Sequence, residues 1–242
     1  MPAQIPGTFF PEVLFLQSVE NSEQLPPDDG TEVAFAGRSN AGKSSALNAI
    51  CGRRSLARTS KLPGRTRLIN FFGVGPSRRL VDLPGYGYAK VPAAVRARWQ
   101  QSIAAFFGER RSLRGVVMVA DVRQPLGPLD RQMLDWCQSA GLPVHLLLSK
   151  CDKLSHGAAA EALAATRRML EAADGGFVVS VQLFSALTRE GVNEAQVRVL
   201  QWLGVAGEQD KKNPGNKGRE SGAYKQSRKN VRDFPRSGRR SG

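Results

Sequence analysis

Apolar residues recur along the chain in two alternating patterns. Short, nearly continuous apolar runs predict buried β-strands, and between these runs apolar positions repeat at helical spacing. The expected strands are Thr31–Ala36, Leu68–Val74, Arg79–Val81, Val116–Ala120, Val144–Leu148 and Phe177–Phe184. The expected helices are Lys43–Cys51, a helix carrying Val95, Trp99, Ile103 and Phe106, then Asp130–Ser139, Ala158–Ala173, and a last helix carrying Val192, Gln196, Val199 and Leu203. This alternation predicts an α/β fold with a mostly parallel sheet and helices on both faces.

The same pattern divides the chain into three parts. Residues 1–30 form an N-terminal extension that becomes rich in Pro and Asp near its end. The α/β pattern occupies residues 31–206, and its hairpin from Leu68 to Val81, turning at Gly75-Pro76-Ser77, predicts one antiparallel strand. From Gly207 onward Lys, Arg, Gly, Ser and Asn dominate, which predicts a disordered basic tail over 207–242.

Charge changes this picture by indicating a partner. The net charge is +14, from 35 Lys and Arg against 21 Asp and Glu. Residues 207–242 hold 11 basic and 4 acidic side chains, so half of the net charge lies in the tail. A basic balance of this kind indicates a polyanionic partner.

Cysteine usage and hydropathy indicate the compartment. Cys51, Cys137 and Cys151 form no C-x-x-C pair and leave one cysteine over, which favours free thiols in a reducing compartment without a disulfide partner. The N-terminus has no basic region before its apolar stretch, which argues against a signal peptide. No apolar run approaches the ~20 residues of a membrane span. We therefore expect a cytoplasmic protein with no membrane partner.

The segment between the first strand and the first helix has the composition of a phosphate-binding loop. Residues 37–44 read Gly-Arg-Ser-Asn-Ala-Gly-Lys-Ser, which is G-x-x-x-x-G-K-[ST]. Gly37 and Gly42 allow a tight turn whose N–H groups point at a β-phosphate, and the helix that follows adds its positive end. Lys43 is expected to contact the β- and γ-phosphates and Ser44 to ligate Mg²⁺.

Two further segments fit a nucleotide switch. Asp82-Leu83-Pro84-Gly85 follows a strand, where Asp82 can hold Mg²⁺ through water and the Gly85 N–H can contact a γ-phosphate. Arg53–Thr66 is basic and rich in Ser and Thr, and Thr66 is expected to complete the Mg²⁺ shell when GTP is bound. Thr59 and Ser60 are alternatives to Thr66.

Two segments near the end of the pattern indicate guanine. Ser149-Lys150-Cys151-Asp152 follows a buried strand, and the Asp152 carboxylate can accept two hydrogen bonds from guanine N1–H and N2–H₂. Adenine has no such donors, and an unpaired carboxylate costs about 1–3 kcal/mol or more. Ser185-Ala186-Leu187 follows Phe184, and the Ala186 N–H is expected to donate to guanine O6.

With these residues in place, the chain resembles the EngB family (also called YihA or YsxC), bacterial GTPases of ribosome assembly within the TrmE-Era-EngA-EngB-Septin-like superfamily. The resemblance covers roughly residues 10–205. It rests on Gly-Arg-Ser-Asn-Ala-Gly-Lys-Ser-Ser at 37–45, Ala-Arg-Thr-Ser-Lys-Leu-Pro-Gly-Arg-Thr at 57–66, Leu-Ile-Asn-Phe-Phe at 68–72 and Asp-Leu-Pro-Gly-Tyr-Gly-Tyr-Ala at 82–89. Ser149 departs from it, since the family more often has Thr there and most GTPases have Asn.

The resemblance implies a single Ras-like P-loop GTPase domain that binds GTP and GDP with Mg²⁺. It also implies association with the large ribosomal subunit and its rRNA, and a requirement for normal cell division and septation. We expect a monomer. Catalytic candidates are Lys43, Thr66 and Gly85, and the metal ligands are Ser44 and Thr66. The candidate nucleotide-binding residues are Gly37, Arg38, Ser39, Asn40, Ala41, Gly42, Lys43, Ser44, Gly64, Arg65, Thr66, Arg67, Leu68, Asp82, Leu83, Pro84, Gly85, Ser149, Lys150, Cys151, Asp152, Phe184, Ser185 and Ala186.

Some residues admit two interpretations. Tyr86 stands where Ras-like enzymes carry the Gln that orients the attacking water, so hydrolysis is expected to be slow and stimulated by a partner; the alternative is that Tyr86 only packs in its loop. Asn40 matches a position where related GTPases recruit K⁺, and a local hydrogen bond is the alternative. Asp121 is expected to cap a turn. His145, His156 and the three Trp residues are expected to be structural.

Two other functions compete with a GTPase switch. A different P-loop enzyme such as a nucleotide kinase would need an acceptor site and leaves Ser149–Asp152 unexplained. A nucleic-acid-binding module with a vestigial nucleotide site does not account for Lys43, Ser44, Thr66 and Asp82, which are all intact.

Overall fold

The computed structural model describes residues 10–20, 22–57, 68–87, 93–172 and 179–205, with side chains omitted over 93–100. Seven strands are seen: β1 (Val13–Val19), β2 (Thr31–Gly37), β3 (Ile69–Val74), β4 (Arg78–Asp82), β5 (Leu113–Asp121), β6 (Val144–Ser149) and β7 (Val179–Leu183). The helices are η1 (Ser22–Gln24), α1 (Lys43–Ile50), α2 (Ala93–Glu109), α3 (Pro128–Ser139), η2 (Cys151–Lys153), α4 (His156–Ala172) and α5 (Val192–Trp202). The predicted alternation of strands and helices is confirmed.

These strands form one sheet in the order β1-β3-β4-β2-β5-β6-β7. β2 pairs in parallel with β4 and β5, and β5, β6 and β7 continue in parallel. β3 pairs antiparallel with both β1 and β4, so it is the one reversed strand of the described sheet. This confirms the prediction of a mostly parallel sheet with one antiparallel strand.

The periodicity does not predict β1, which lies within the proposed N-terminal extension. Its apolar run Val13–Leu16 is only four residues long and is followed by Gln17 and Ser18, and a bulge shifts the register between Phe15 and Gln17. A bulge breaks the two-residue period that identifies a half-buried strand. β1 therefore extends the sheet beyond the strands that the sequence predicts.

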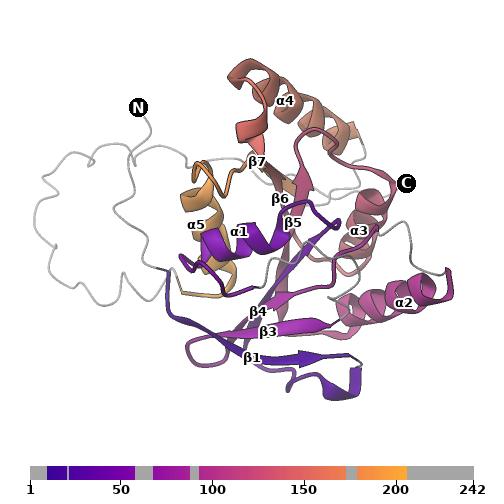
Figure 1. Ribbon diagram of the computed structural model, residues 1–242. Coiled ribbons are helices and arrows are strands. Elements are labelled where there is room, and N and C mark those ends of the chain that lie inside the picture. The colour runs from indigo at the N-terminus through magenta and orange to yellow at the C-terminus, as the bar shows by residue number, and fades with distance from the viewer. Residues whose placement is uncertain (1–9, 21, 58–67, 88–92, 173–178, 206–242) are drawn as a thin grey trace, which may run out of the picture.

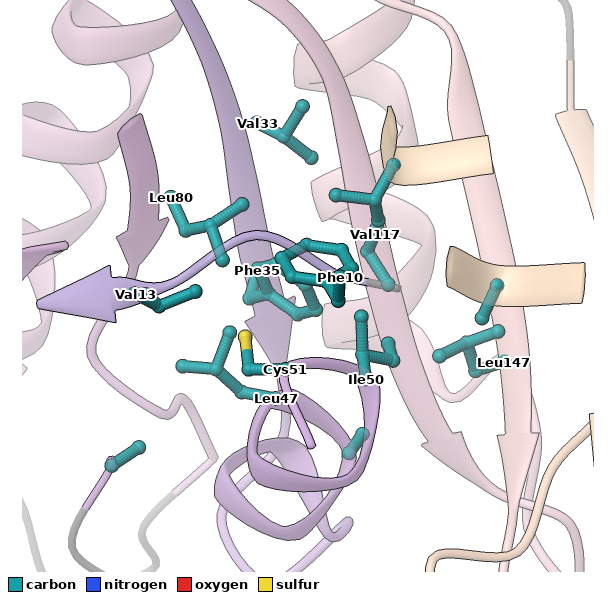
Figure 2. Close-up of a cluster of buried hydrophobic side chains, with 14 of the residues drawn as sticks. Phe10, Val13, Val33, Phe35, Leu47, Ile50, Cys51, Leu80, Val117 and Leu147 are labelled. Carbon is teal, nitrogen blue, oxygen red and sulfur yellow. The ribbon is translucent and has the colours of Figure 1, made fainter. Parts of the chain in front are cut away.

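Two apolar layers hold the helices on the sheet. Alternate residues of β2 point to opposite faces: Val33 and Phe35 pack against α1 and α5, and Ala34 and Ala36 pack against α2 and α3. Figure 2 shows Phe35 among Leu47 and Ile50 of α1 and Val117 of β5. The central strand is thus buried on both faces from Glu32 to Gly37, and the helices that cover the two faces are seen in Figure 1.

The amino ends of the strands are closed by buried charges. Glu32 is fully buried, and its carboxylate accepts hydrogen bonds from Arg79 Nε at 2.6 Å and from Arg110 Nε and Nη2 at 2.8 and 2.7 Å. The two guanidinium groups also donate to the carbonyls of Pro26 and Pro27. This network ties the segment before β2 to β4 and to the end of α2.

The three cysteines are free and buried, as expected. Burial raises the pKa of Cys51 and Cys137 to about 12 and that of Cys151 to about 11, so all three thiols are protonated at neutral pH. In the described ranges, every helix is too short or too polar to cross a bilayer.

We predict that Glu32→Gln lowers the free energy of unfolding by about 3–5 kcal/mol, because two buried guanidinium groups lose their shared counter-charge. Urea unfolding measures this change. Glu12→Gln is the matched control, since Glu12 pairs with Arg53 at 3.2 Å on the surface and its loss is expected to cost about 1 kcal/mol or less. Equal losses for the two variants would contradict the stabilising role of the buried network.

Candidate nucleotide-binding site

The predicted site segments meet at the carboxyl edge of the parallel strands. In the strand order, β2 has β4 on one side and β5, β6 and β7 on the other, so the loops after β4, β6 and β7 lie along the same edge as the loop after β2. Open α/β sheets bind their ligands at this edge. Of the predicted site residues, Gly64, Arg65, Thr66 and Arg67 lie outside the described residues, and Leu68 directly precedes β3.

The phosphate-binding loop has backbone geometry that demands glycine. A Cβ on Gly37 would lie 2.6 Å from the Val119 carbonyl oxygen, so β2 and β5 can approach only if this residue has no side chain. Gly42 has φ +99°, in the left-handed region, and it precedes α1 without a side-chain cap. The first N–H groups of α1 are therefore left for an anionic ligand rather than for a capping side chain.

Lys43 and Asp82 lie together beneath this loop. The Lys43 Nζ donates to Asp82 Oδ1, and the two side chains are only 10% and 5% exposed. Asp82 reaches Lys43 because β4 pairs with β2 in a register that aligns Asp82 with Phe35. A buried ammonium and a buried carboxylate at this point suit a phosphate group and a hard divalent cation respectively.

The residues present fit Mg²⁺ held jointly with a phosphate. Asp82 and the Ser44 hydroxyl supply oxygen donors of the kind Mg²⁺ prefers. The described residues contain no group of three or more His, Cys, Asp or Glu that could enclose a metal alone. Mg²⁺ bound by one or two protein oxygens and by substrate phosphates needs no such cage.

The segment Asp82–Tyr86 is fastened to the phosphate-binding loop through the backbone. Tyr86 N–H donates to the Gly37 carbonyl at 3.3 Å, and Ser39 N–H donates to the Tyr86 carbonyl at 2.7 Å. Gly85 is consequently held against Ser39, where a Cβ on Gly85 would lie 3.2 Å from Ser39 Oγ. That hydroxyl is buried and makes no hydrogen bond within the described residues, which leaves it free for a ligand at this point.

The guanine-binding candidates form a second set of fixed contacts. Ser185 Oγ donates to Asp152 Oδ1 at 2.6 Å, and the same hydroxyl accepts the N–H groups of Leu187 and Thr188. The Ser185 bond is the main cause of the lowered pKa of Asp152. Ser185 thus holds the Asp152 side chain in one orientation and favours its ionised form.

Lys150 and Ser149 connect the base end of the site to the phosphate end. Lys150 Nζ donates to the Asn40 carbonyl at 2.6 Å and to Asp121 Oδ2 at 3.0 Å, so its stem crosses the phosphate-binding loop. Ser149 Oγ contacts the carbonyl oxygens of Ala41 and Ala120. Although Ser149 departs from the family pattern, its hydroxyl still contacts the phosphate-binding loop.

Asp121 caps a turn, as expected, and has an unexpected second role. Its Oδ1 accepts the Arg123 N–H at 3.1 Å, and the carboxylate pairs with the Arg123 guanidinium and with Lys150. Arg123, with Lys150 as a further cause, holds the pKa of Asp121 well below its usual range. Asp121 therefore orients Lys150 across the loop. The parallel pairing of β5 with β6 brings these two residues together, so the sequence alone did not reveal the contact.

A pocket of about 640 Å³ lies at the base end of the site and reaches Gly42 of the phosphate-binding loop. Gly42, Ser149, Lys150, Asp152, Phe184 and Ala186 line it, all of them predicted site residues. It is also lined by Arg53, Arg54 and Leu187, which belong to the predicted segments without being named as site residues, and by Lys153 and Arg189, which lie outside those segments. A second pocket of about 450 Å³ lies on the other side of Lys150, against residues 38–41.

The comparisons with known proteins agree with this geometry. Residues 32–150 match a family model described as 50S ribosome-binding GTPase. The probable GTP-binding protein EngB of Nitrosococcus oceani is 56% identical over 185 residues, covering 76% of this chain and 91% of the relative. That of Methylobacillus flagellatus is 54% identical over 194 residues, covering 80% and 93%. The chain belongs to the EngB family of GTP-binding proteins.

Solved structures show the same fold at lower sequence identity. A crystal structure of a probable GTP-binding protein EngB aligns with a TM-score of 0.58 and 21% identity, covering 72% of this chain and 98% of that one. Era in complex with MgGDPNP and a segment of 16S ribosomal RNA aligns with a TM-score of 0.55 and 19% identity, covering 72% and 57%. The P-loop GTPase fold predicted for this EngB family member is thereby confirmed.

Tyr86 in this EngB family member packs into the core. It is only 4% exposed, and its hydroxyl donates to Asp130 Oδ1 at 2.8 Å. Asp130, fully buried, also accepts the Gly127 N–H at 2.9 Å through Oδ2, at the start of α3. Burial raises the pKa of Asp130 and that of Tyr86. The phenol therefore connects the Asp82–Tyr86 segment to α3.

The remaining interpreted residues are structural where they are described. His145 is buried, and its ring nitrogens contact Ser180 Oγ and Gln182 Oε1, both at 2.8 Å. Trp136 and Trp202 pack against the two apolar layers, and the Trp99 side chain lies outside the described residues. His156 is exposed at the start of α4. The role of Asp130, which lies in the first turn of α3 and accepts a hydrogen bond from the Tyr86 hydroxyl, was not predicted from the sequence. Its signal was available, because Gly127, Pro128 and an acidic residue at 130 form a helix-start pattern.

We predict that Tyr86→Phe lowers stability by about 1–3 kcal/mol at neutral pH, because buried Asp130 loses a hydrogen-bond donor. Losing that donor raises the pKa of Asp130 further, so the folded variant retains its proton to higher pH. The deficit therefore shrinks as pH falls toward the usual range of a carboxyl and grows as pH rises through the folded pKa.

Urea unfolding at about pH 4.5 and about pH 7.5 measures this dependence. Ser18→Ala, which removes the exposed Ser18–Asn70 hydrogen bond, is the control and is expected to change stability by about 0.5 kcal/mol or less at both pH values. A deficit in the Tyr86 variant that does not depend on pH would argue against the coupling to Asp130.

Proposed function

We propose that this chain binds GTP and GDP with Mg²⁺ and hydrolyses GTP as a switch in the assembly of the large ribosomal subunit. On the family resemblance, this step serves normal cell division and septation in the bacterial cytoplasm. The observation that carries the proposal is the 640 Å³ pocket, because Gly42 of the phosphate-binding loop and Asp152 line the same space. A nucleoside triphosphate would place its phosphates at Gly37–Ser44 and its base at Asp152.

Guanine selectivity comes from the fixed carboxylate. Ser185 holds Asp152 by a 2.6 Å hydrogen bond, so the carboxylate is oriented before the ligand arrives. Guanine N1–H and N2–H₂ can donate to it, whereas adenine leaves it without a donor. The aliphatic part of the Lys150 side chain lies along the base, and the Ala186 N–H donates to guanine O6.

Hydrolysis depends on residues around the γ-phosphate. Lys43 neutralises charge that develops on the β- and γ-phosphate oxygens, and Gly85 donates its N–H to the γ-phosphate. Ser44 and Thr66 would ligate Mg²⁺, with Asp82 behind a water, and the bound metal neutralises phosphate charge. Since Tyr86 is turned into the core, it leaves no amide to orient the attacking water, and turnover without a partner is slow.

The ribosome is the proposed partner. The matching family model is described as a 50S ribosome-binding GTPase, and the chain carries a net charge of +14. Lys and Arg that neutralise rRNA phosphates release counterions and give affinity with little sequence preference. Residues 207–242 lie outside the described residues, and we propose that their charge contributes to this contact.

Asp152→Asn tests the base assignment. The amide no longer accepts both guanine donors but suits xanthine, so GTP affinity is expected to fall by about tenfold or more while XTP affinity rises. Competition with a fluorescent guanine nucleotide measures both affinities. ATP is included as a competitor to test the alternative of a nucleotide kinase. Asp135→Asn, at an exposed site on α3, is the control. Unchanged GTP binding in the Asp152 variant would show that the base lies elsewhere.

We predict faster GTP hydrolysis in K⁺ than in Na⁺ at equal ionic strength, because Asn40 can help to hold a K⁺ ion beside the phosphates. Within the described residues the Asn40 side chain makes no hydrogen bond, which favours this interpretation over a local bond. Asn40→Gly keeps the left-handed φ of +64° and is expected to abolish the difference between the ions. Equal rates in the two salts for the unmodified protein would remove K⁺ from the mechanism.

Truncation after Ala206 is predicted to leave GTP binding and folding intact, because every nucleotide motif lies upstream. It is expected to weaken binding to large ribosomal subunits and to flatten the dependence of that binding on salt. Co-sedimentation with purified subunits at two salt concentrations, in GDP and in a non-hydrolysable GTP analogue, measures this. Identical affinities and salt slopes for both proteins would assign the ribosome contact to the GTPase domain alone.

A further inference from the structure

β1 presents three consecutive large apolar side chains to the surface. Leu14, Phe15 and Leu16 are 59%, 56% and 52% exposed, although the ends of the same strand, Val13 and Val19, are buried. Two other large apolar side chains in the described ranges are exposed, Met169 on α4 at 40% and Leu187 in the loop after β7 at 76%, and they lie apart from β1. Contiguous exposed apolar residues mark interaction sites more often than isolated ones do.

These side chains extend both faces of the sheet. The Phe15 ring packs edge-on against Phe72, with centroids 5.9 Å apart, on the face that carries α1 and α5. Leu16 lies over Gly73. Gly73 is next to Phe72 on β3 and therefore faces the opposite side of the sheet. A further strand beside β1 would therefore find apolar surface for its side chains on both faces.

The outer edge of β1 is open in the described part of the chain. β1 is the terminal strand of the sheet and pairs only with β3 there (Figure 1). Val13–Val19 contains no Lys, Arg or Pro, which are the residues that commonly protect an edge from pairing. The bulge at Leu16 divides the edge, so that a short partner strand can pair with either half.

Charge around this edge is opposite to that of the rest of the molecule. Residues 1–30 hold five of the 21 acidic side chains and none of the 35 Lys and Arg. Glu12 precedes β1 and contacts Arg53, while Glu20 and Glu23 follow β1, are exposed and form no ion pair within the described residues. The apolar edge is thus flanked by carboxylates.

This combination selects the occupant. Nucleic acid and anionic lipid would meet Glu20 and Glu23, which have no ion pair within the described residues, with like charge. A second copy paired antiparallel about Leu16 would place Glu12 of one chain opposite Glu20 of the other, which is unfavourable. We propose that β1 is a docking edge for a partner protein segment, an extended peptide that adds a strand and carries Lys or Arg around alternating apolar residues.

This edge is separate from the nucleotide site, and peptide binding is measured without GTP hydrolysis and without a ribosome. The probe is a display library of random dodecapeptides, selected on the full-length, GDP-loaded protein. Selected peptides are expected to alternate apolar residues and to carry Lys or Arg at their ends. Their affinities, measured by fluorescence anisotropy, are expected to fall about tenfold or more with Phe15→Lys and with Leu14→Lys.

Three controls make the outcome decisive. Met169→Lys changes an exposed apolar residue on α4 and is expected to leave peptide binding unchanged. Thermal unfolding and GDP binding confirm that the β1 variants fold. N-methylation of alternate peptide N–H groups is expected to abolish binding, because backbone pairing supplies the affinity.

Other results would overturn the proposal. A library that yields no peptide sensitive to Phe15→Lys would show that the edge docks no such segment. A concentration-dependent dimer in sedimentation experiments that Phe15→Lys dissociates would identify a second copy as the occupant. Loss of rRNA binding in Phe15→Lys, with peptide binding absent, would identify RNA.

Discussion

The phosphate-binding loop depends on the hydrogen bonding of its own backbone. A loop that turns its N–H groups toward a ligand leaves carbonyl groups on its outer side, and buried polar groups need partners. Here the Asn40 carbonyl accepts from Lys150 and the Ala41 carbonyl is contacted by Ser149. The Gly37 carbonyl accepts from Tyr86. Because these partners come from β6 and from the segment after β4, the whole carboxyl edge of the sheet fixes one loop.

This arrangement joins the proposed base site to the proposed phosphate site through contacts within the protein. Lys150 and Asp152 are two residues apart, so a contact that positions Lys150 on the loop also positions the carboxylate that faces the base. Tyr86 extends the linkage to α3 through Asp130.

The two ends of the sheet use buried charge for different purposes. At the amino end Glu32 is neutralised by two guanidinium groups that also donate to carbonyls, so the charges are fully satisfied and serve stability. At the carboxyl end Lys43 and Asp82 have only each other within the described residues, and each retains capacity for a ligand. A phosphate can take the place of Asp82 beside Lys43, and a metal ion can take the place of Lys43 beside Asp82. This buried pair therefore belongs to the proposed site.

The sequence by itself determined the order of strands and helices, the reversed strand β3 and the identity of the nucleotide motifs. These features are local: they depend on residue spacing, on glycine at positions such as Gly37 and Gly42, and on the polar residues that follow each strand. The sequence also indicated the family, because Pro-Gly-Arg-Thr at 63–66 and Pro-Gly-Tyr-Gly-Tyr-Ala at 84–89 are quite specific to it. Only the tertiary structure placed β1 in the sheet, turned Tyr86 onto Asp130, set Asp121 against Lys150 and paired Glu32 with Arg79 and Arg110. Those contacts join residues about 29 to 78 positions apart, and strand pairing rather than local spacing decides which of them meet.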